Sequence, residues 1–440
     1  MSRLGLCAVI IFLTIPTLTS AGDWPQWRGP NFNGSTDEKN LPQRWTRTDN
    51  IAWSADVSCA ASTPIVCGGK VFLTGADKDS DMLQVMCFDR ADGKLLWKHD
   101  TAKGIKIGRR SNYASPSPVA DGERVFFFFG NGDLFCYDLK GKRIWARNIQ
   151  KDFGQFVFQW TFSSSPLLFD GRLYLQVLQR DVPVDGRGFK DRENKSYLLA
   201  MDQRTGKTLW QHIRPSKAEA ESHEAYSTPM PYSHNGAYQL LIVGGDAVSG
   251  HDPASGEELW RWGTWNPTRI PHWRLVPSPI AGDGIVVACA PKRDPLYAVK
   301  LGGKGQLTDD ALAWVSRETR EVSSDVPSPA FYDGDFFVLS DVRKSLSRVE
   351  PRTGKVKWTV QTPGRKKYEA SPLAGDGKIY IVNFDGLVSV INAADGKVMQ
   401  EISMDEPAAG EVVRSSVVAS DGQLFIRTTR KLYCVGDKGK

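Results

Sequence analysis

The sequence predicts an all-β fold, namely an eight-bladed β-propeller whose four-stranded antiparallel blades form a ring closed by an N-terminal strand. Three observations predict it. A turn-and-tryptophan unit returns along the 440 residues, a Ser-Pro element separates successive units, and helical periodicity is nearly absent. Units of roughly 40–50 residues that hold short strands are typical of propellers. One propeller can therefore account for most of the chain.

The turn-and-tryptophan unit has the pattern Asp-x-x-x-Gly-Lys-x-x-Trp, which Asp202, Gly206 and Trp210 show most completely. We expect the Asp to accept N–H groups of the turn and the Gly to adopt a positive φ. The tryptophan should end the fourth strand of its blade and lie on the next blade, as a structural residue. These blade-docking residues are Trp53, Trp97, Trp145, Trp210, Trp260, Trp314 and Trp358. Gln400 stands in the remaining copy, where we expect the weakest packing between blades.

The Ser-Pro element predicts the first strand of each blade, and the Gly-containing turn after it predicts the hairpin to the second strand. Seven copies end in proline, whereas Ser415-Ser416-Val417 has lost it. The C-terminal region supplies only three strands of an eighth blade. We expect the segment around Trp53 to provide the fourth, because such closure removes the open edges of the array.

The N-terminus predicts export. Arg3 precedes an apolar run, Leu4 to Leu18, that ends in Thr19-Ser20-Ala21. This pattern is typical of a signal peptide, here residues 1–21, with an uncleaved anchor helix as the alternative. We expect an N-terminal arm at 22–49, whose segment Trp24-Pro25-Gln26-Trp27 lies on a neighbouring blade, the propeller at 50–436 and a tail at 437–440. The mature chain should have no transmembrane span and should be periplasmic or secreted.

Charge and cysteine spacing exclude some functions. The formal charge is +6, but Lys and Arg are scattered through turns, so nucleic-acid binding is not expected. The six cysteines outside the leader are not spaced like a disulfide framework. Because no Cys-x-x-Cys or His/Cys pair at ligand spacing occurs, we expect no metal site.

The repeat also carries a family resemblance over nearly all of the mature chain. The unit that ends at Trp210 resembles the tryptophan-docking repeat of pyrroloquinoline-quinone (PQQ)-type propellers. That superfamily contains quinone-dependent alcohol and sugar dehydrogenases and a non-catalytic, BamB-like branch that serves outer-membrane protein assembly. The head Asp23 to Pro30, with Gly302-Gly303-Lys304-Gly305, is similar to exported propellers of planctomycete-type bacteria.

The dehydrogenase branch implies features that this chain lacks. It implies a divalent cation, an acidic base and a clamp that includes a disulfide of adjacent cysteines, whereas this sequence has no Cys-Cys pair and no haem Cys-x-x-Cys-His motif. We therefore favour an exported protein-interaction scaffold without a cofactor, with an envelope protein as its partner. A PQQ-dependent alcohol or sugar dehydrogenase, another enzyme that uses the channel mouth, and glycan or small-ligand binding at the channel remain alternatives. The oligomeric state is not predicted.

Connections that precede the first strand of each blade should converge at the mouth of the central channel. Polar and aromatic residues gathered there suit a small polar ligand or an extended peptide, although a hydrated mouth where Glu369 simply pairs with Arg414 is the alternative. No catalytic residue is assigned, because the adjacent His223 and Glu224 should point apart. The candidates are Asn112, Tyr113, Trp160, His223, Glu224, Arg274, Asp325, Glu369 and Arg414, and the same connections hold Arg110 and Tyr226. The longer connections 180–195 and 262–272 are expected at the rim as mobile loops or partner contacts.

Overall fold

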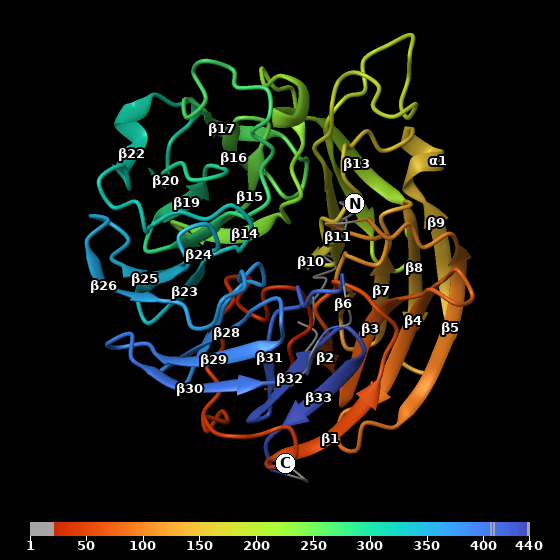
Figure 1. The fold of residues 1–440 in the computed structure, drawn as a ribbon. Coiled ribbons are helices and arrows are strands. Elements are labelled where there is room, and N and C mark those ends of the chain that lie inside the picture. The colour runs from red at the N-terminus through yellow and green to blue at the C-terminus, as the bar shows by residue number, and fades with distance from the viewer. Residues whose placement is uncertain (1–21, 109, 405–406, 408–409, 438–440) are drawn as a thin grey trace, which may run out of the picture.

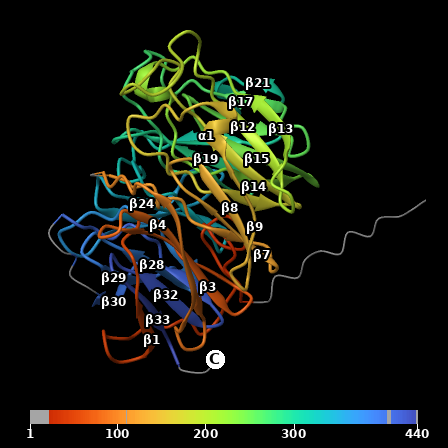
Figure 2. The same ribbon diagram turned by 90° about the vertical axis from the view of Figure 1, so that its right-hand side faces the viewer.

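The computed structural model describes residues 22–108, 110–404, 407 and 410–437, and its strands form eight sheets around a channel (Figure 1). The four main strands of each blade pair antiparallel with their neighbours, and the predicted eight-bladed propeller is confirmed. Figure 2 shows the same ribbon turned by 90°. The predicted signal peptide, residues 1–21, lies outside the described residues, as do residues 438–440 of the predicted tail. None of the described helices has the length and apolar character needed to cross a bilayer.

We number the blades in chain order. Within each blade, the strands are given from the inner strand beside the channel to the outer strand at the rim. Blade 1 contains β2 (Ile65–Cys67), β3 (Lys70–Asp77), β4 (Met82–Asp89) and β5 (Leu95–Lys103). Blade 2 contains β6 (Val119–Ala120), β7 (Arg124–Phe128), β8 (Asp133–Asp138) and β9 (Arg143–Asn148). Blade 3 contains β10 (Leu167–Phe169), β11 (Arg172–Val177), β12 (Tyr197–Asp202) and β13 (Thr208–Ile213). Blade 4 contains β14 (Met230–His234), β15 (Ala237–Gly244), β16 (Ala247–His251), β17 (Glu258–Trp262) and a fifth strand, β21 (Gly305–Gln306).

The second half of the ring repeats this order. Blade 5 contains β18 (Ile280–Gly282), β19 (Ile285–Cys289), β20 (Leu296–Lys300) and β22 (Leu312–Val315). Blade 6 contains β23 (Ala330–Tyr332), β24 (Asp335–Ser340), β25 (Ser345–Val349) and β26 (Val356–Gln361). Blade 7 contains β27 (Leu373–Gly375), β28 (Lys378–Val382), β29 (Leu387–Asn392) and β30 (Val398–Ser403). Blade 8 contains β31 (Val418–Ser420), β32 (Gln423–Arg427), β33 (Lys431–Val435) and β1 (Ile51–Asp56). The described helices are α1 (Ile149–Phe153), η1 (Ala220–His223) and η2 (Asp309–Ala311).

The ring closes between the two ends of the chain, as predicted. Strand β1 pairs antiparallel with β33, with Trp53 opposite Cys434, and the two strands lie side by side in Figure 1. The buried apolar clusters bridge adjacent blades; one of them joins residues of blades 7, 8 and 1 around the closing strand. The core is therefore distributed between blades rather than gathered at one centre, as a radial array requires.

Tryptophans of the repeat lock six of the eight blade junctions. The indole N–H of Trp210 donates to the carbonyl oxygen of Pro253, in the turn of blade 4, at 3.3 Å. Five further tryptophans make the equivalent bond to the next blade at 2.7–3.2 Å, namely Trp53, Trp97, Trp145, Trp314 and Trp358. A Cβ on the turn glycine of the receiving blade would lie less than 3.0 Å from each of these six rings. Glycine is therefore required in this turn for two reasons. It adopts a positive φ, and it leaves room for the tryptophan ring of the preceding blade.

Trp260 departs from the expected docking. Its indole N–H donates at 2.6 Å to the side-chain oxygen of Gln239 in its own blade. The reason is that blade 5 lacks an Asp-x-x-x-Gly turn between β20 and β22. Residues of that connection instead cross to blade 4, where β21 pairs parallel with β17. At Gln400 the receiving blade is blade 8, whose third and fourth strands are separate ends of the chain, so this junction also lacks a turn to dock on.

The N-terminal arm contacts blade 1 at Trp24 and then continues across the propeller. Backbone bonds join Trp24 to Val66 of blade 1 and Pro25 to Ala120 of blade 2. Further along, Arg28 donates to the carbonyl oxygens of Pro329 and Pro372, at the start of the inner strands of blades 6 and 7. Because these inner strands lie on different sides of the ring, the arm closes one end of the channel.

Candidate functional site

A closed ring of hydroxyl groups surrounds the channel, and its residues precede the inner strands. Each donates its backbone N–H to the side-chain hydroxyl of the equivalent residue in the next blade, at 2.8–3.1 Å. We call this set the hydroxyl ring; its members are Thr63, Ser117, Ser165, Thr228, Ser278, Ser328, Ser371 and Ser416. Each hydroxyl accepts one bond within the ring and keeps its own O–H as a donor. The ring therefore presents hydroxyl donors to whatever enters the channel.

The arm forms the floor of a cavity of about 180 Å³ in this channel. Trp27 lines the cavity together with seven of the eight ring residues, all except Ser278. Behind it, the guanidinium of Arg28 lies 5.7 Å from the centre of the Trp27 ring. Arg28 is buried and binds carbonyl oxygens, so desolvation lowers its pKa to about 9. A cationic group thus lies behind the aromatic floor.

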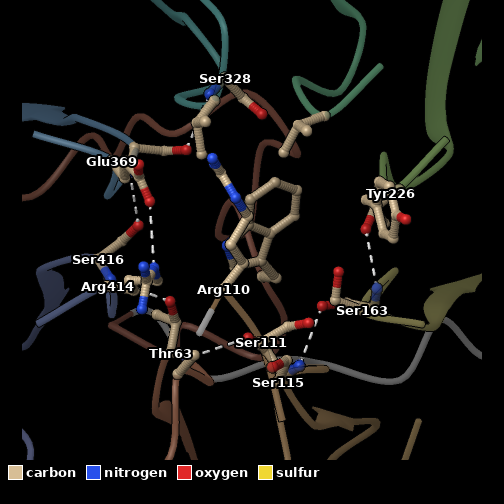
Figure 3. A pocket seen from close by; sticks show the side chains of 18 of the residues that line it. Thr63, Arg110, Ser111, Ser115, Ser163, Tyr226, Ser328, Glu369, Arg414 and Ser416 are labelled. Atoms are coloured by element: carbon tan, nitrogen blue, oxygen red, sulfur yellow. Dashed lines mark hydrogen bonds and ion pairs between the residues drawn. The ribbon is translucent and has the colours of Figure 1, made fainter. Parts of the chain in front are cut away.

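Three arginines and one glutamate stand at the mouth, on the side opposite the arm. Arg414 pairs with Glu369 at 3.1 Å, and Figure 3 shows this pair across the cavity from Tyr226. Arg274 pairs with Asp325, also at 3.1 Å. Arg110 lies over the ring of Trp160, at 5.3 Å from its centre, and it forms no ion pair within the described part of the chain. The mouth is therefore cationic and has an aromatic wall.

The structure divides the nine predicted site residues into three groups. Trp160, Arg274, Glu369 and Arg414 line the cavity. Glu224 and Asp325 do not line it but hold residues that do. The Tyr226 hydroxyl donates a hydrogen bond to the Glu224 carboxylate at 2.5 Å, and Asp325 accepts hydrogen bonds from Arg274.

Asn112, Tyr113 and His223 lie outside the cavity lining. The side-chain oxygen of Asn112 accepts the N–H of Ala114 and so shapes its own turn. Tyr113 lies beside Lys106, whose ammonium is 5.8 Å from the centre of the tyrosine ring. Desolvation lowers the pKa of His223, whose Nε2 lies 3.6 Å from Asp181. These three residues are therefore part of the loop connections and not of the cavity lining.

Burial and ion pairing shift the pKa values of the carboxyl groups behind the mouth in different directions. Burial raises the pKa of Glu224, although Tyr226 and Arg180 oppose that shift. Burial acts on Asp325 in the same direction, but the charge and hydrogen bonds of Arg274 outweigh it and lower the pKa. Asp341, which accepts the N–H of Asp325, has its pKa raised to about 6 by burial. The mouth therefore contains an ionised Arg274–Asp325 pair. Beside it lies the carboxyl group of Asp341, which titrates in mildly acidic solution.

Trp27 and the hydroxyl ring escaped prediction as site residues. The Ser-Pro element by itself predicts the start of a strand, and the sequence of the arm predicts contact with a blade. A signal was present for the ring, because Ser416 keeps the hydroxyl in the copy where proline is lost. For Trp27 the available signal was an aromatic residue outside the repeat, in Trp24-Pro25-Gln26-Trp27.

The cavity does not fit the cation that quinone catalysis implies. Glu369 is the one carboxylate in the lining, and it is engaged by Arg414. Among the residues that the structure describes, no group of three or more His, Cys, Asp or Glu side chains could hold a metal ion. A divalent cation needs several oxygen ligands. Because this set of donors does not supply them, we derive no step through a quinone and its cation.

Two kinds of similar protein bear on function. Quinohemoprotein alcohol dehydrogenase ADH-IIG from Pseudomonas putida is 27% identical over 169 residues, which are 36% of this chain and 21% of that protein. The chain thus spans about a fifth of that relative's length. The crystal structure of quinohemoprotein alcohol dehydrogenase from Comamonas testosteroni covers 95% of this chain over 81% of its own, with 13% identity and a TM-score of 0.64.

The second kind consists of assembly factors. The crystal structure of BamB from Moraxella catarrhalis covers 88% of this chain over 98% of its own, with 12% identity and a TM-score of 0.55. At such identities both solved structures show a shared fold. The family model described as outer membrane protein assembly factor BamB matches residues 43–156 and 244–439, more than two thirds of the chain. The chain therefore belongs to this BamB-like family of PQQ-type propellers.

Proposed function

We propose that the chain is a non-catalytic binding propeller whose channel cavity takes a small hydroxylated ligand that carries an anionic group. The observation that supports this most is the composition of the cavity lining, which has three arginines, one glutamate and most of the hydroxyl ring. Arg274 and Arg414 are matched by Asp325 and Glu369, whereas Arg110 has no acidic partner among the described residues. An anion would therefore find an unmatched charge at the mouth.

A sugar acid matches each part of this cavity. Its carboxylate would meet Arg110, its hydroxyl groups would exchange hydrogen bonds with the hydroxyl ring, and its apolar ring face would lie on Trp27 or Trp160. Arg28 adds a positive potential behind the Trp27 ring. A pocket with apolar walls and a few convergent polar groups is the usual form of a small-molecule site.

Titration calorimetry with D-glucuronate tests this proposal, with D-glucose as the uncharged control. We expect the acid to bind more tightly than the neutral sugar, and Arg110→Gln to weaken glucuronate by about tenfold. Arg204→Gln changes an exposed arginine in a rim turn and should leave binding unchanged. Equal affinities for glucuronate and glucose would contradict the proposed role of the anionic group.

A scaffold role in envelope protein assembly is the second candidate, and the family match supports it. It would require export by the leader predicted at residues 1–21 and a protein partner that contacts the rim or the mouth. Affinity capture from native envelopes under mild detergent would test it. Recovery of an outer-membrane assembly subunit would support the role, and its loss in rim variants that still fold would locate the contact.

Quinone-dependent dehydrogenase activity is the competing proposal, because two curated relatives and two of the solved structures carry that activity in their names. Their likeness supports it about as much as the likeness to BamB supports a scaffold. The cavity lining argues against it, since it holds a single carboxylate. Purified protein mixed with PQQ and Ca²⁺ should reduce no dye with alcohols or sugars. Turnover under these conditions would overturn the non-catalytic part of our proposal.

A further inference from the structure

A groove lies at the rim between blades 2 and 3, and it shares no lining residue with the channel cavity. Its volume is about 780 Å³. Its walls come from α1, from the connection between β11 and β12, and from the outer strand β13, and Figure 1 shows α1 and β13 on the same side of the rim. Apolar side chains in it are Phe153, Phe189, Tyr197 and Ile213.

Two features of the groove indicate that it receives a ligand. Tyr197 is 3% exposed, yet its hydroxyl has no hydrogen-bond partner among the described residues. A buried hydroxyl without a partner is destabilising by about 1–3 kcal/mol, so a ligand that bonds to it would remove that penalty. In contrast, Ile213 is 40% exposed at the end of an unpaired strand edge. The groove therefore contains the buried Tyr197 hydroxyl, which has no hydrogen-bond partner among the described residues, and the exposed apolar side chain of Ile213.

The charges around the groove favour an acidic ligand. Lys151, Arg192 and Lys195 line it, and none of them forms an ion pair within the described part of the chain. Of the two acidic residues in the lining, Asp152 is already paired with Arg147 at 2.7 Å, and Glu193 is exposed. Three unmatched cations therefore face one unmatched carboxylate.

The neighbouring blade shows what kind of chain segment the edge of β13 can accept. In blade 4, Gly305 and Gln306 pair parallel with Trp260 and Arg261 of β17. The backbone N–H of Leu307 then donates to the carbonyl oxygen of Arg261 at 2.7 Å. Through the tryptophan repeat, Trp260 and Arg261 correspond to Trp210 and Gln211 of β13, and Gln211 lines the groove.

The segment that follows this pairing in blade 4 supplies a template for the ligand. Leu307 packs against the apolar cluster of that blade, and the Asp309 carboxylate accepts the indole N–H of Trp262 at 3.1 Å. An apolar residue is thus followed two positions later by an acidic one. A segment added in the same direction on β13 would run from Trp210 toward Ile213, and its apolar and acidic residues would then reach the groove.

We propose that this groove binds an extended segment of a partner protein, which adds as a parallel strand to β13. The segment places an apolar side chain against Phe153, Phe189 and Tyr197, and an acidic side chain beside Lys151, Arg192 and Lys195. This proposal gives a position and a mode to the scaffold function among the proposals above, and it is independent of ligand binding in the channel. Strand addition at an open edge with pockets for side chains is a general mode of peptide recognition.

Fluorescence anisotropy with a labelled peptide tests the proposal on the full chain. The probe is Gly-Gly-Gly-Gln-Leu-Thr-Asp-Asp, and its matched control replaces Leu by Ser. We expect saturable binding of the probe, at least about tenfold weaker binding of the control, and weakening with added salt. Ile213→Glu should abolish binding, whereas Ile144→Glu, at an exposed position on blade 2 outside the groove, should leave it unchanged.

Tyr197→Phe separates a binding role from a structural one. Removal of a hydroxyl that has no partner should not lower the thermal stability, but it should weaken the probe by about threefold or more. Absence of saturable binding at millimolar probe, or equal binding by the Ile213→Glu and Ile144→Glu variants, would overturn the groove proposal. A partner captured from envelopes that still binds the Ile213→Glu variant would leave the scaffold function standing and remove only this site.

Discussion

Two circular sets of contacts hold this propeller together, and they differ in completeness. The outer set consists of tryptophans seated on turn glycines, and it is missing at two junctions, after blade 4 and after blade 7. The inner set, the hydroxyl ring, is unbroken. The outer contact disappears where the receiving turn is absent, so it serves packing and depends on the turn of the next blade. The inner contact persists even at Ser416, where the proline beside it is lost, which indicates a requirement at the channel itself.

The largest effect should come from removing one contact of the outer set. Trp53→Ala deletes a buried ring that packs on Gly93 and donates to the carbonyl oxygen of Arg90. We expect a loss of about 3–5 kcal/mol in the free energy of unfolding, measured by chemical denaturation. An unchanged denaturation midpoint would remove the basis for treating the outer set as the lock between blades.

Below the mouth, the inner region should respond to pH through Asp341. Its pKa is raised from 3.8 to about 6 by burial, so between about pH 4 and 6 the folded state binds a proton that the unfolded state has lost. This group therefore makes the protein less stable as the pH rises through that window, by at most about 3 kcal/mol. Asp341→Asn should flatten this part of the stability profile in urea titrations at each pH. A wild-type profile that the variant reproduces would show that Asp341 does not titrate as described.

Within the hydroxyl ring, Thr228→Val removes one acceptor while keeping the side-chain shape. The N–H of Ser165 then loses its bond of 3.0 Å in a buried setting. The expected loss is about 1–3 kcal/mol in the free energy of unfolding. Thr228→Ser, the control, keeps the hydroxyl and should lose less. A smaller loss for Thr228→Val than for Thr228→Ser would mean that the methyl group, and not the ring bond, stabilises this position.

A pair of glycine substitutions isolates the contact between turn and tryptophan. Gly256 and Gly236 both have positive φ, 79° and 81°, but only Gly256 has a tryptophan ring where its Cβ would be. Gly236→Ala should therefore lose about 1 kcal/mol from backbone strain alone, and Gly256→Ala should lose clearly more. Thermal melts of the two variants side by side measure the difference, and equal melting temperatures would argue against steric seating of Trp210.

The smallest effect is expected where the outer set is already broken. Gln400→Trp restores the repeat residue, but blade 8 offers no turn for it to dock on. We expect little change in stability, within about 0.5 kcal/mol. A large gain would show that tryptophan stabilises the junction without a receiving turn, and the comparison between the two sets would have to be revised.

The sequence predicted the ring and its closure because both depend on local patterns: Asp-Gly hairpins, the repeat spacing, and a missing fourth strand that Trp53 completes. It also predicted that Trp160, Arg274, Glu369 and Arg414 lie near one another, because loops at equivalent places in a ring converge, and these four residues line the cavity. It did not predict that Trp27 floors the channel, since the path of an arm without a repeat depends on long-range contacts such as Arg28 with Pro329 and Pro372.

Trp260 shows a second limit of predicting contacts from a sequence motif. Its repeat unit is complete, and its different contact follows from a turn that is missing some 40–50 residues later in the next blade. A motif therefore predicts a docking contact only if its receiver is also present. The same rule identifies Gln400 as a position where the tryptophan would have no receiver.

The central claim is that the channel is a binding site for a small anionic ligand, and a crystal structure of the protein grown with D-glucuronate tests it most directly. The account predicts ligand density between Trp27 and Trp160, with the carboxylate at Arg110 and hydroxyl groups against the hydroxyl ring. A channel that contains only solvent at saturating glucuronate, or a ligand whose carboxylate points away from the arginines, would contradict it.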